Sequence, residues 1–180
     1  MLKNMKITKL PIKDCYKILF KPNKDGRGYF TRTYCKKEFK KFGVNDKWVQ
    51  NNLSLNKNKS TLRGLHFQTK PFEEDKLVRC IQGSVMDYVL DLRKKSKTYM
   101  KLIQIKLSDK NFVSIYVPRG CAHGYITLEN NTILSYSVTN YYNKKNERTF
   151  SFFNKKLKIK FPIKPKYISK KDLNPKNTLL

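Results

Sequence analysis

The stretch from Lys76 to Leu92, KLVRCIQGSVMDYVLDL, decides the class of fold. Its two apolar runs, Lys76 to Ile81 and Val85 to Leu92, are rich in residues that favour extended backbone. Between them lies Gln82-Gly83-Ser84, a tripeptide with the composition of a tight turn. Runs of this length on either side of such a turn predict two strands joined as a hairpin.

The second of these strands carries two carboxylates on one face. Because side chains alternate along a strand, Val85, Asp87, Val89 and Asp91 point to the same side. Valines alternating with aspartates suit a strand that lines a partly polar cavity, and two aspartates that simply face solvent give the same pattern. The pattern alone leaves both interpretations open.

Strand signals continue along the chain. Leu102 to Leu107 alternates, with Ile103, Ile105 and Leu107 on one face, and Val113, Ile115 and Val117 alternate before Pro118. Tyr125 to Leu128 and Thr132 to Tyr142 are predicted to pair across Glu129-Asn130-Asn131. Lys36 to Phe42 is the one short helix expected before the barrel, ended by Gly43. From about Lys155 onward Pro and Lys accumulate. We therefore predict an all-β barrel or double-sheet jelly roll with a short N-terminal helix and an extended C-terminal segment packed across it.

The bulk composition fits one soluble domain. At 180 residues, the chain is predicted to form a single domain, residues 1–180, which buries about 70% of its unfolded surface. Four cysteines without paired spacing predict free thiols in a reducing compartment. The N-terminus has lysines but no apolar stretch of signal-peptide length, and no later segment is suited to span a membrane. We expect a cytoplasmic protein.

The charge of the chain is strongly positive. Forty Lys+Arg against 13 Asp+Glu give a net charge of +27, which is typical of nucleic-acid binding. The lysines are spread along the whole chain, however, and no basic tail or aromatic-interleaved basic motif stands out. With Asn also abundant, a codon preference explains the bias better than a nucleic-acid partner. We expect no nucleic-acid or membrane partner, although the positive field would attract an anionic small substrate.

Four short motifs place polar residues where packing alone would not demand them. They are TLRGLHFQ at residues 61–68, KLVR at 76–79, VPRGCAHGY at 117–125 and SYS at 135–137. The first contains His66, one of 2 histidines, in an apolar setting that disfavours the imidazolium. A base must be neutral near pH 7 to accept a proton, so the motif is suited to base chemistry.

These motifs, in this order, resemble the dTDP-4-dehydrorhamnose 3,5-epimerase family of nucleotide-sugar enzymes, over about residues 27–172. The resemblance implies a cupin-type jelly roll and a homodimer that needs no cofactor and no metal. It also implies epimerisation at C3, C5 or both of a nucleotide-diphosphate-linked 4-keto-6-deoxy sugar, in the biosynthesis of cell-surface polysaccharide such as lipopolysaccharide or capsule.

Epimerisation beside a ketone needs a base, a group that stabilises the enolate oxygen, and an acid on the other face. By the resemblance, His66 is the base and Asp172, in the motif ISKKD at 168–172, fixes its tautomer. The resemblance also implies that Lys76 of the KLVR motif lies near the ketone oxygen and that Tyr136 is the acid on the opposite face.

The nucleotide end of the site follows from two further matches. RGYF at residues 27–30 and QNN at 50–52 correspond to family motifs. Phe30 is expected to stack on the base, Gln50 and Asn52 to hydrogen-bond to it, and Arg27 and Arg63 to bind phosphate oxygens.

The chain departs from the family pattern beside Phe30. Arg32 stands where the thymidine enzymes usually carry Glu, and the loop between Gln50 and His66 is one residue longer than usual. An arginine can bind the O6 and N7 edge of guanine, which thymine lacks. We therefore hypothesise a GDP-linked substrate, with a heptose as one possible sugar, beside the dTDP-linked hexose of the family. Phe153-Asn154-Lys155, where the family tends to have an acidic residue before Pro, is interpreted as a turn variant.

His123 invites a metal interpretation, because Pro-x-Gly-x-x-His resembles a motif of metal-binding cupins. Such sites draw on three or four ligands, and this chain has no His-x-His pair. The family resemblance places His123 close to the substrate instead. Two other functions stay open: a 3,4-ketoisomerase on the same substrates, and a non-catalytic barrel that binds sugar nucleotides or nucleic acid.

Overall fold

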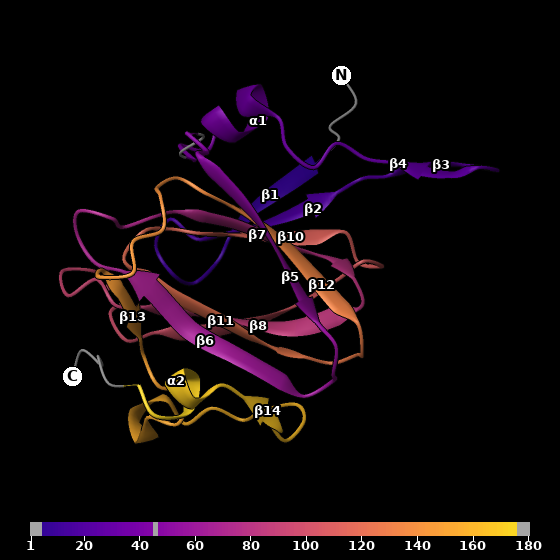
Figure 1. Cartoon of the computed structure of the whole chain (residues 1–180). Coiled ribbons are helices and arrows are strands. Elements are labelled where there is room, and N and C mark those ends of the chain that lie inside the picture. The colour runs from indigo at the N-terminus through magenta and orange to yellow at the C-terminus, as the bar shows by residue number, and fades with distance from the viewer. Residues whose placement is uncertain (1–4, 45–46, 176–180) are drawn as a thin grey trace.

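Two antiparallel sheets face each other in this computed structural model, which describes residues 5–44 and 47–175. The first sheet has six strands in the order β1 (Met5–Lys9), β2 (Tyr16–Phe20), β10 (Val113–Val117), β7 (Lys76–Gln82), β12 (Thr132–Val138) and β5 (Gln50–Asn56). The second has the order β13 (Glu147–Thr149), β6 (Thr61–Gln68), β11 (Cys121–Thr127), β8 (Ser84–Asp91) and β9 (Leu102–Ser108), and β14 (Tyr167–Ile168) pairs with β6 in parallel. The predicted jelly-roll barrel is confirmed (Figure 1).

The predicted strands form, but the two predicted hairpins are wrong. β7 and β8 adjoin at Gly83 and still belong to different sheets, as β11 and β12 do. β8 pairs with β9 and β11, and β7 pairs with β10 and β12. The turns therefore carry the chain from one sheet to the other instead of joining hydrogen-bonded neighbours.

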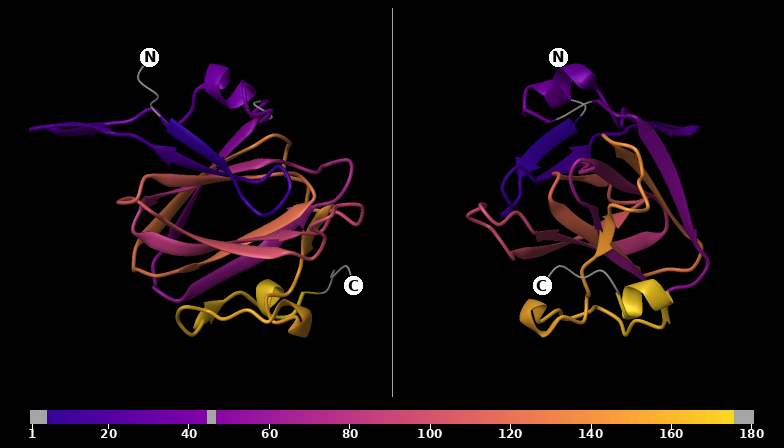
Figure 2. Two further views of the ribbon diagram at one scale, coloured as in Figure 1. Left: turned by 180° about the vertical axis from the view of Figure 1, so that it is seen from behind. Right: turned by 60° about the vertical axis from the view of Figure 1, so that its left-hand side comes forward.

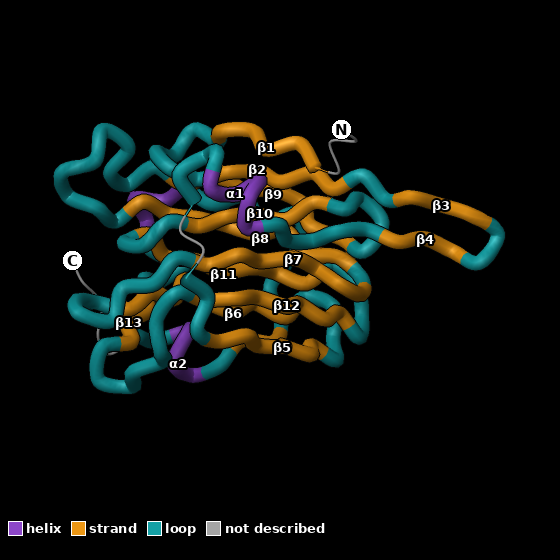
Figure 3. Tube along the Cα trace, turned by 90° about the horizontal axis from the view of Figure 1, so that it is seen from above, coloured by secondary structure: helices purple, strands orange, loops and turns teal. Residues whose placement is uncertain are grey.

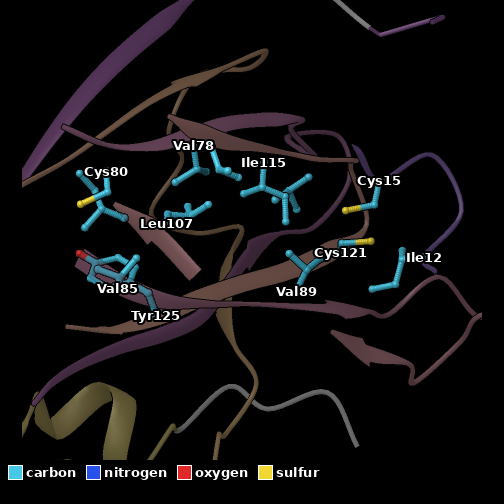
Figure 4. Packing of buried hydrophobic residues seen from close by; sticks show 13 residues of the cluster. Ile12, Cys15, Val78, Cys80, Val85, Val89, Leu107, Ile115, Cys121 and Tyr125 are labelled. Carbon is cyan, nitrogen blue, oxygen red and sulfur yellow. The ribbon is translucent and has the colours of Figure 1, made fainter. Parts of the chain in front are cut away.

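The space between the sheets holds the main core (Figure 4). Val78 and Ile115 of the first sheet meet Val85, Val89 and Leu107 of the second, and all five are fully buried. This confirms the faces predicted for β8, β9 and β10. Asp87 and Asp91 share this inner side of β8 with no exposed area, so the interpretation that they face solvent is wrong.

Two further layers cover the outer faces of the sheets (Figure 2). The predicted short helix, α1 (Lys36–Lys40), buries Phe39 against Tyr16, Ile18 and Tyr116 of the first sheet. The predicted C-terminal segment packs Leu157, Ile159, Phe161 and Ile163 against the second sheet. It contains a 3-10 turn (Lys155–Leu157), β14 and a helix not foreseen from the sequence, α2 (Lys170–Leu173).

One element leaves the barrel. β3 (Asn23–Asp25) and β4 (Gly28–Phe30) form a two-stranded arm that projects away from both sheets (Figures 1 and 3). Tyr29 and Phe30 at its base are 58% and 69% exposed.

The four cysteines are free thiols. Burial raises the pKa of Cys80 and of Cys121 to about 12 and raises that of Cys15 further, so these three thiols stay protonated near neutral pH. Within residues 5–44 and 47–175, no helix is long and apolar enough to cross a membrane.

Candidate active site

A pocket of about 330 Å³ gathers most of the catalytic residues predicted from the sequence. β6 contributes His66, β7 contributes Lys76, and β12 contributes Tyr136. Gln50 and Asn52 of β5 complete this side. Residues from both sheets thus reach one cavity, as a jelly roll allows when the side chains of two sheets turn inward.

The position of His66 depends on two glycines where β6 meets β11. His66 lies opposite His123 in the register, which is irregular between His123 and Tyr125. A Cβ on Gly64 would lie 2.7 Å from Gly124 Cα, and Gly64 has φ +110°, a conformation that favours glycine. The close approach of the two backbones therefore requires the glycine that precedes His66 by two residues.

His66 is held by Asp172, as predicted. The two side chains are joined by a hydrogen bond of 2.6 Å between His66 Nε2 and Asp172 Oδ1. Burial works against the Asp172 carboxylate, but the hydrogen bonds from His66 and Ser169 outweigh it and lower the pKa of Asp172. Because Asp172 is an anion, it accepts the proton on Nε2, and Nδ1 of the neutral ring is left free to take a proton.

Helix α2 places the carboxylate of Asp172. Ser169 caps the helix, and its Oγ accepts a hydrogen bond of 3.1 Å from the Asp172 amide. Asp172 is 4% exposed although its neighbours Lys170 and Lys171 face solvent. The C-terminal segment is therefore part of the site, and it does more than cover the sheet.

Lys76 forms an ion pair inside the pocket. Its Nζ lies 2.8 Å from Glu74 Oε1, and the two side chains are 10% and 9% exposed. A buried ammonium of this kind needs a partner, because desolvation without one is costly. Lys76 also retains donors beyond the one that Glu74 uses, since an ammonium has three.

Tyr136 enters from the sheet opposite His66. It lies on β12, next to β7, whereas His66 lies on β6 of the other sheet. Burial raises the pKa of Tyr136, the negative charge of Glu74 adds to the effect, and Arg63 opposes it. The phenol is consequently protonated at neutral pH and available as a proton donor.

His123 lies behind the pocket and does not line it. Its Nε2 and Asp87 Oδ2 share a hydrogen bond of 2.7 Å, and His123 is 8% exposed. Burial raises the pKa of Asp87, while His123 and Lys76 act in the other direction. Within the described ranges, no group of three His, Cys, Asp or Glu residues has the geometry to hold a metal ion.

The predicted nucleotide-binding residues divide into two groups. Gln50 donates to Asn52 at 2.9 Å in the pocket, and Arg63 borders an adjoining groove that also contains His66. Arg27, Phe30 and Arg32 lie elsewhere. Arg27 is on the arm, 92% exposed and paired with Asp25, and Phe30 lies at the arm's base. Arg32 borders a separate groove formed with β1 and α1. Arg27, Phe30 and Arg32 therefore do not line the pocket that contains His66 in the same chain.

Sequence reasoning missed four polar groups that line the pocket: Gln68, Glu74, Glu147 and Tyr142. Glu147 accepts from Tyr142 Oη at 2.9 Å and pairs with Lys171 at 2.5 Å. The run Glu73-Glu74-Asp75, directly before the KLVR motif, could have indicated a carboxylate in the site, because acidic residues are rare in this chain.

The fold and pocket together define a class: a jelly-roll barrel whose pocket contains a histidine paired with a carboxylate and, from the opposite sheet, a tyrosine. A family model described as dTDP-4-dehydrorhamnose 3,5-epimerase matches residues 9–178. A dTDP-4-dehydrorhamnose 3,5-epimerase from Sinorhizobium fredii is 40% identical over 157 residues, 86% of this chain and 80% of the relative.

Solved structures agree. The crystal structure of dTDP-4-dehydrorhamnose 3,5-epimerase from Elizabethkingia anophelis has a TM-score of 0.90 and 40% identity, covering 95% of this chain and 94% of that one. An epimerase from Legionella pneumophila in complex with dTDP-4-keto-L-rhamnose has a TM-score of 0.88 and 31% identity, covering 93% and 89%. The chain belongs to the dTDP-4-dehydrorhamnose 3,5-epimerase family. It is an enzyme, a nucleotide-sugar 3,5-epimerase.

Proposed function

We propose that the pocket epimerises C3, C5 or both of a nucleotide-linked 4-keto-6-deoxy sugar through an enolate. The observation that carries this proposal is the entry of His66 and Tyr136 into one pocket from opposite sheets. A base and an acid on opposite sides of a ring carbon are what inversion of that carbon requires.

In the proposed reaction, His66 Nδ1 removes the proton from the carbon beside the ketone. The electron pair of that C–H bond moves to the ketone oxygen, and Lys76 stabilises the resulting enolate charge by donating a hydrogen bond. Tyr136 Oη then delivers a proton to the other face of the carbon, and the enolate electrons return to form the new C–H bond. Solvent then removes the proton from the His66 imidazolium and returns one to the Tyr136 phenolate, which resets the site.

The substrate that we propose is a dTDP-linked sugar, supported by the family and by the Legionella pneumophila complex. Gln50 and Asn52 are proposed to bind the base and Arg63 a phosphate. Arg32 supports guanine as the alternative base. Titration calorimetry with thymidine and guanosine diphosphates separates the two: tighter binding of guanosine diphosphate would overturn the dTDP proposal.

We further propose that the enzyme works as a homodimer in the cytoplasm. Arg27 and Phe30 are proposed substrate contacts, yet they lie on or beside an arm that projects away from the barrel. In a two-fold dimer, the same surface of each copy contacts the other, so each arm can reach the partner's pocket.

The test of the reaction is proton NMR in D2O. Wild-type protein incubated with dTDP- and GDP-linked 4-keto-6-deoxy sugars is expected to place deuterium at C3, C5 or both, whereas His66→Ala is expected to show no exchange. A wild-type protein that exchanges neither carbon with either sugar would overturn the proposal. A product with the ketone moved to C3 would instead assign the ketoisomerase reaction.

A further inference from the structure

Glu74 is a fixed carboxylate inside the pocket, beyond the four catalytic residues already assigned. Both of its oxygens are bonded: Oε1 pairs with Lys76 Nζ at 2.8 Å, and Oε2 accepts from Gln68 Nε2 at 2.9 Å. Gln68 is itself held, because Nε2 also donates to the Phe72 carbonyl at 3.0 Å and Oε1 accepts from the Asn143 amide at 2.6 Å. A side chain with both oxygens engaged has little rotational freedom.

The backbone next to Glu74 is fixed as well. Asp75 accepts hydrogen bonds of 2.8 Å from the Arg119 amide and from Arg119 Nη2. The amide of Asp75 donates to Thr139 Oγ1 at 2.9 Å. The turn that leads into β7 is thereby tied to two other segments, and Glu74 and Lys76 keep a constant relation to each other.

The charge of Glu74 acts on Lys76 and on Tyr136. The second pocket carboxylate, Glu147, forms its ion pair with Lys171 and accepts a hydrogen bond from Tyr142. Glu147 raises the pKa of Tyr136 less than Glu74 does. Glu74 faces Lys76 directly, and it contributes to the raised pKa of Tyr136 after burial itself. A nearby negative charge disfavours a phenolate. One carboxylate thus holds the Lys76 ammonium in place and favours the protonated form of Tyr136.

We propose that Glu74 is a positioning residue, which aims the Lys76 ammonium at the ketone oxygen and preserves Tyr136 as a proton donor. Lys76 does not have to break its ion pair to act, because two further N–H groups remain for the ketone. The inference rests on the proposed epimerase reaction and deepens it.

Three variants test the proposal. Glu74→Gln removes the charge, Glu74→Asp keeps it, and Glu73→Gln removes the neighbouring charge as the matched control. At neutral pH, Glu74→Gln is expected to lower kcat about tenfold with KM within about twofold, since the lost interaction acts on the transition state. Glu74→Asp is expected to recover part of kcat, and Glu73→Gln is expected to match the wild type. Unchanged kcat in Glu74→Gln, with an active wild type, would overturn the proposal.

A second measurement needs no substrate. Subtracting the ultraviolet titration curve of Tyr136→Phe from that of the wild type isolates the ionisation of Tyr136. The same subtraction is made between Glu74→Gln and the double variant that carries Glu74→Gln and Tyr136→Phe. Tyr136 is expected to ionise at lower pH without Glu74, and superimposable curves would overturn the inference. If the wild type shows no exchange in D2O, the epimerase proposal fails, and this titration still decides whether Glu74 acts on Tyr136.

Discussion

At the scale of the residue, the chemistry depends on which nitrogen of His66 carries the proton. Asp172 as an anion accepts the proton on Nε2, which leaves Nδ1 as the proposed base. Asp172→Asn keeps the shape but allows the amide to donate to Nε2, which favours the other tautomer. We expect kcat to fall by about 10²- to 10⁴-fold, with KM changed little. Deuterium exchange rates measure the effect.

The control for Asp172→Asn is Lys170→Ala, an exposed change in the same helix. It is expected to leave the exchange rate unchanged. An Asp172→Asn enzyme that exchanges as fast as the wild type would show that the hydrogen bond does not set the tautomer.

Tyr136 separates the two halves of the reaction. Tyr136→Phe removes the phenolic proton without emptying the space that the ring fills. The base His66 is untouched, so exchange of the first proton is expected to continue while formation of the inverted product falls about 10²-fold or more. Comparing deuterium incorporation with product formation in one NMR time course measures this split. Equal loss of both would assign Tyr136 to the first step.

Some site residues could be predicted from the sequence and others could not. His66, Lys76 and Tyr136 stand in motifs with a recognisable order, and the structure brings them into one pocket. Glu74 and Glu147 stand in no such motif, because what a carboxylate does depends on the cation that the fold places beside it. His123 shows the same limit: its motif drew attention, yet its ring nitrogen is occupied by the buried Asp87.

At the scale of the element, the contact between β6 and β11 sets the position of His66. Gly64→Ala would place a methyl group 2.7 Å from Gly124 Cα and from the His123 carbonyl, at φ +110°. We expect a loss of about 3 kcal/mol in the free energy of unfolding, from strain and overpacking together. Urea denaturation measures it. Gly26→Ala in the arm, with nothing within 4 Å of its added Cβ, is the control.

Asp91 anchors the loop that connects β8 to β9. Its carboxylate accepts from Arg93 Nε at 2.8 Å, from Ser96 Oγ at 2.7 Å and from Thr98 Oγ1 at 2.6 Å. Burial opposes ionisation, but these hydrogen bonds outweigh it and hold the pKa of Asp91 well below its usual range. Asp91→Asn removes the buried anion of Arg93 and leaves it only the longer ion pair with Asp14 at 3.8 Å, and we expect a cost of about 3 kcal/mol at pH 7.

The pH dependence of that cost has a definite sign. The pKa of Asp91 is lower in the folded protein than in the unfolded chain, where it is about 3.9. The ionised carboxylate therefore stabilises the fold fully above that pH, and this stabilisation is lost as the pH falls toward the pKa of the folded protein. The stability difference between wild type and Asp91→Asn is therefore expected to be constant from pH 7 to about 5 and to shrink below about 4. A difference that grows on acidification would contradict this assignment.

Alternation along the chain predicts which face of a strand is buried, but it does not predict the partner of that strand. Ile103, Ile105 and Leu107 pack against the core between the sheets, as expected. β7 and β8, however, lie on either side of Gly83 and belong to different sheets. A short glycine turn suits a hairpin and a sheet-to-sheet corner equally well. Strands that are distant in the sequence determine which of the two forms, because β12 pairs with β7 and β11 pairs with β8.

At the scale of the whole molecule, the arm and the pocket are separated by the barrel. Arg27 and Phe30 were placed in the substrate site by motif, and a sequence motif says nothing about which copy of the chain supplies them. The projection of the arm fits a site completed by a second copy. In the proposed dimer, activity therefore requires both copies of the chain.

Mixing two inactive variants tests this arrangement. One carries Arg27→Ala and Phe30→Ala on an intact pocket, and the other carries His66→Ala with an intact arm. After co-refolding at equal amounts, half of the dimers are mixed, and one of the two pockets in each mixed dimer has both an intact His66 and an intact partner arm. Activity is therefore expected to return to about a quarter of the wild-type value per protomer for a two-fold dimer. If each arm served its own pocket, no combination would contain a complete site and the mixture would stay as inactive as its components.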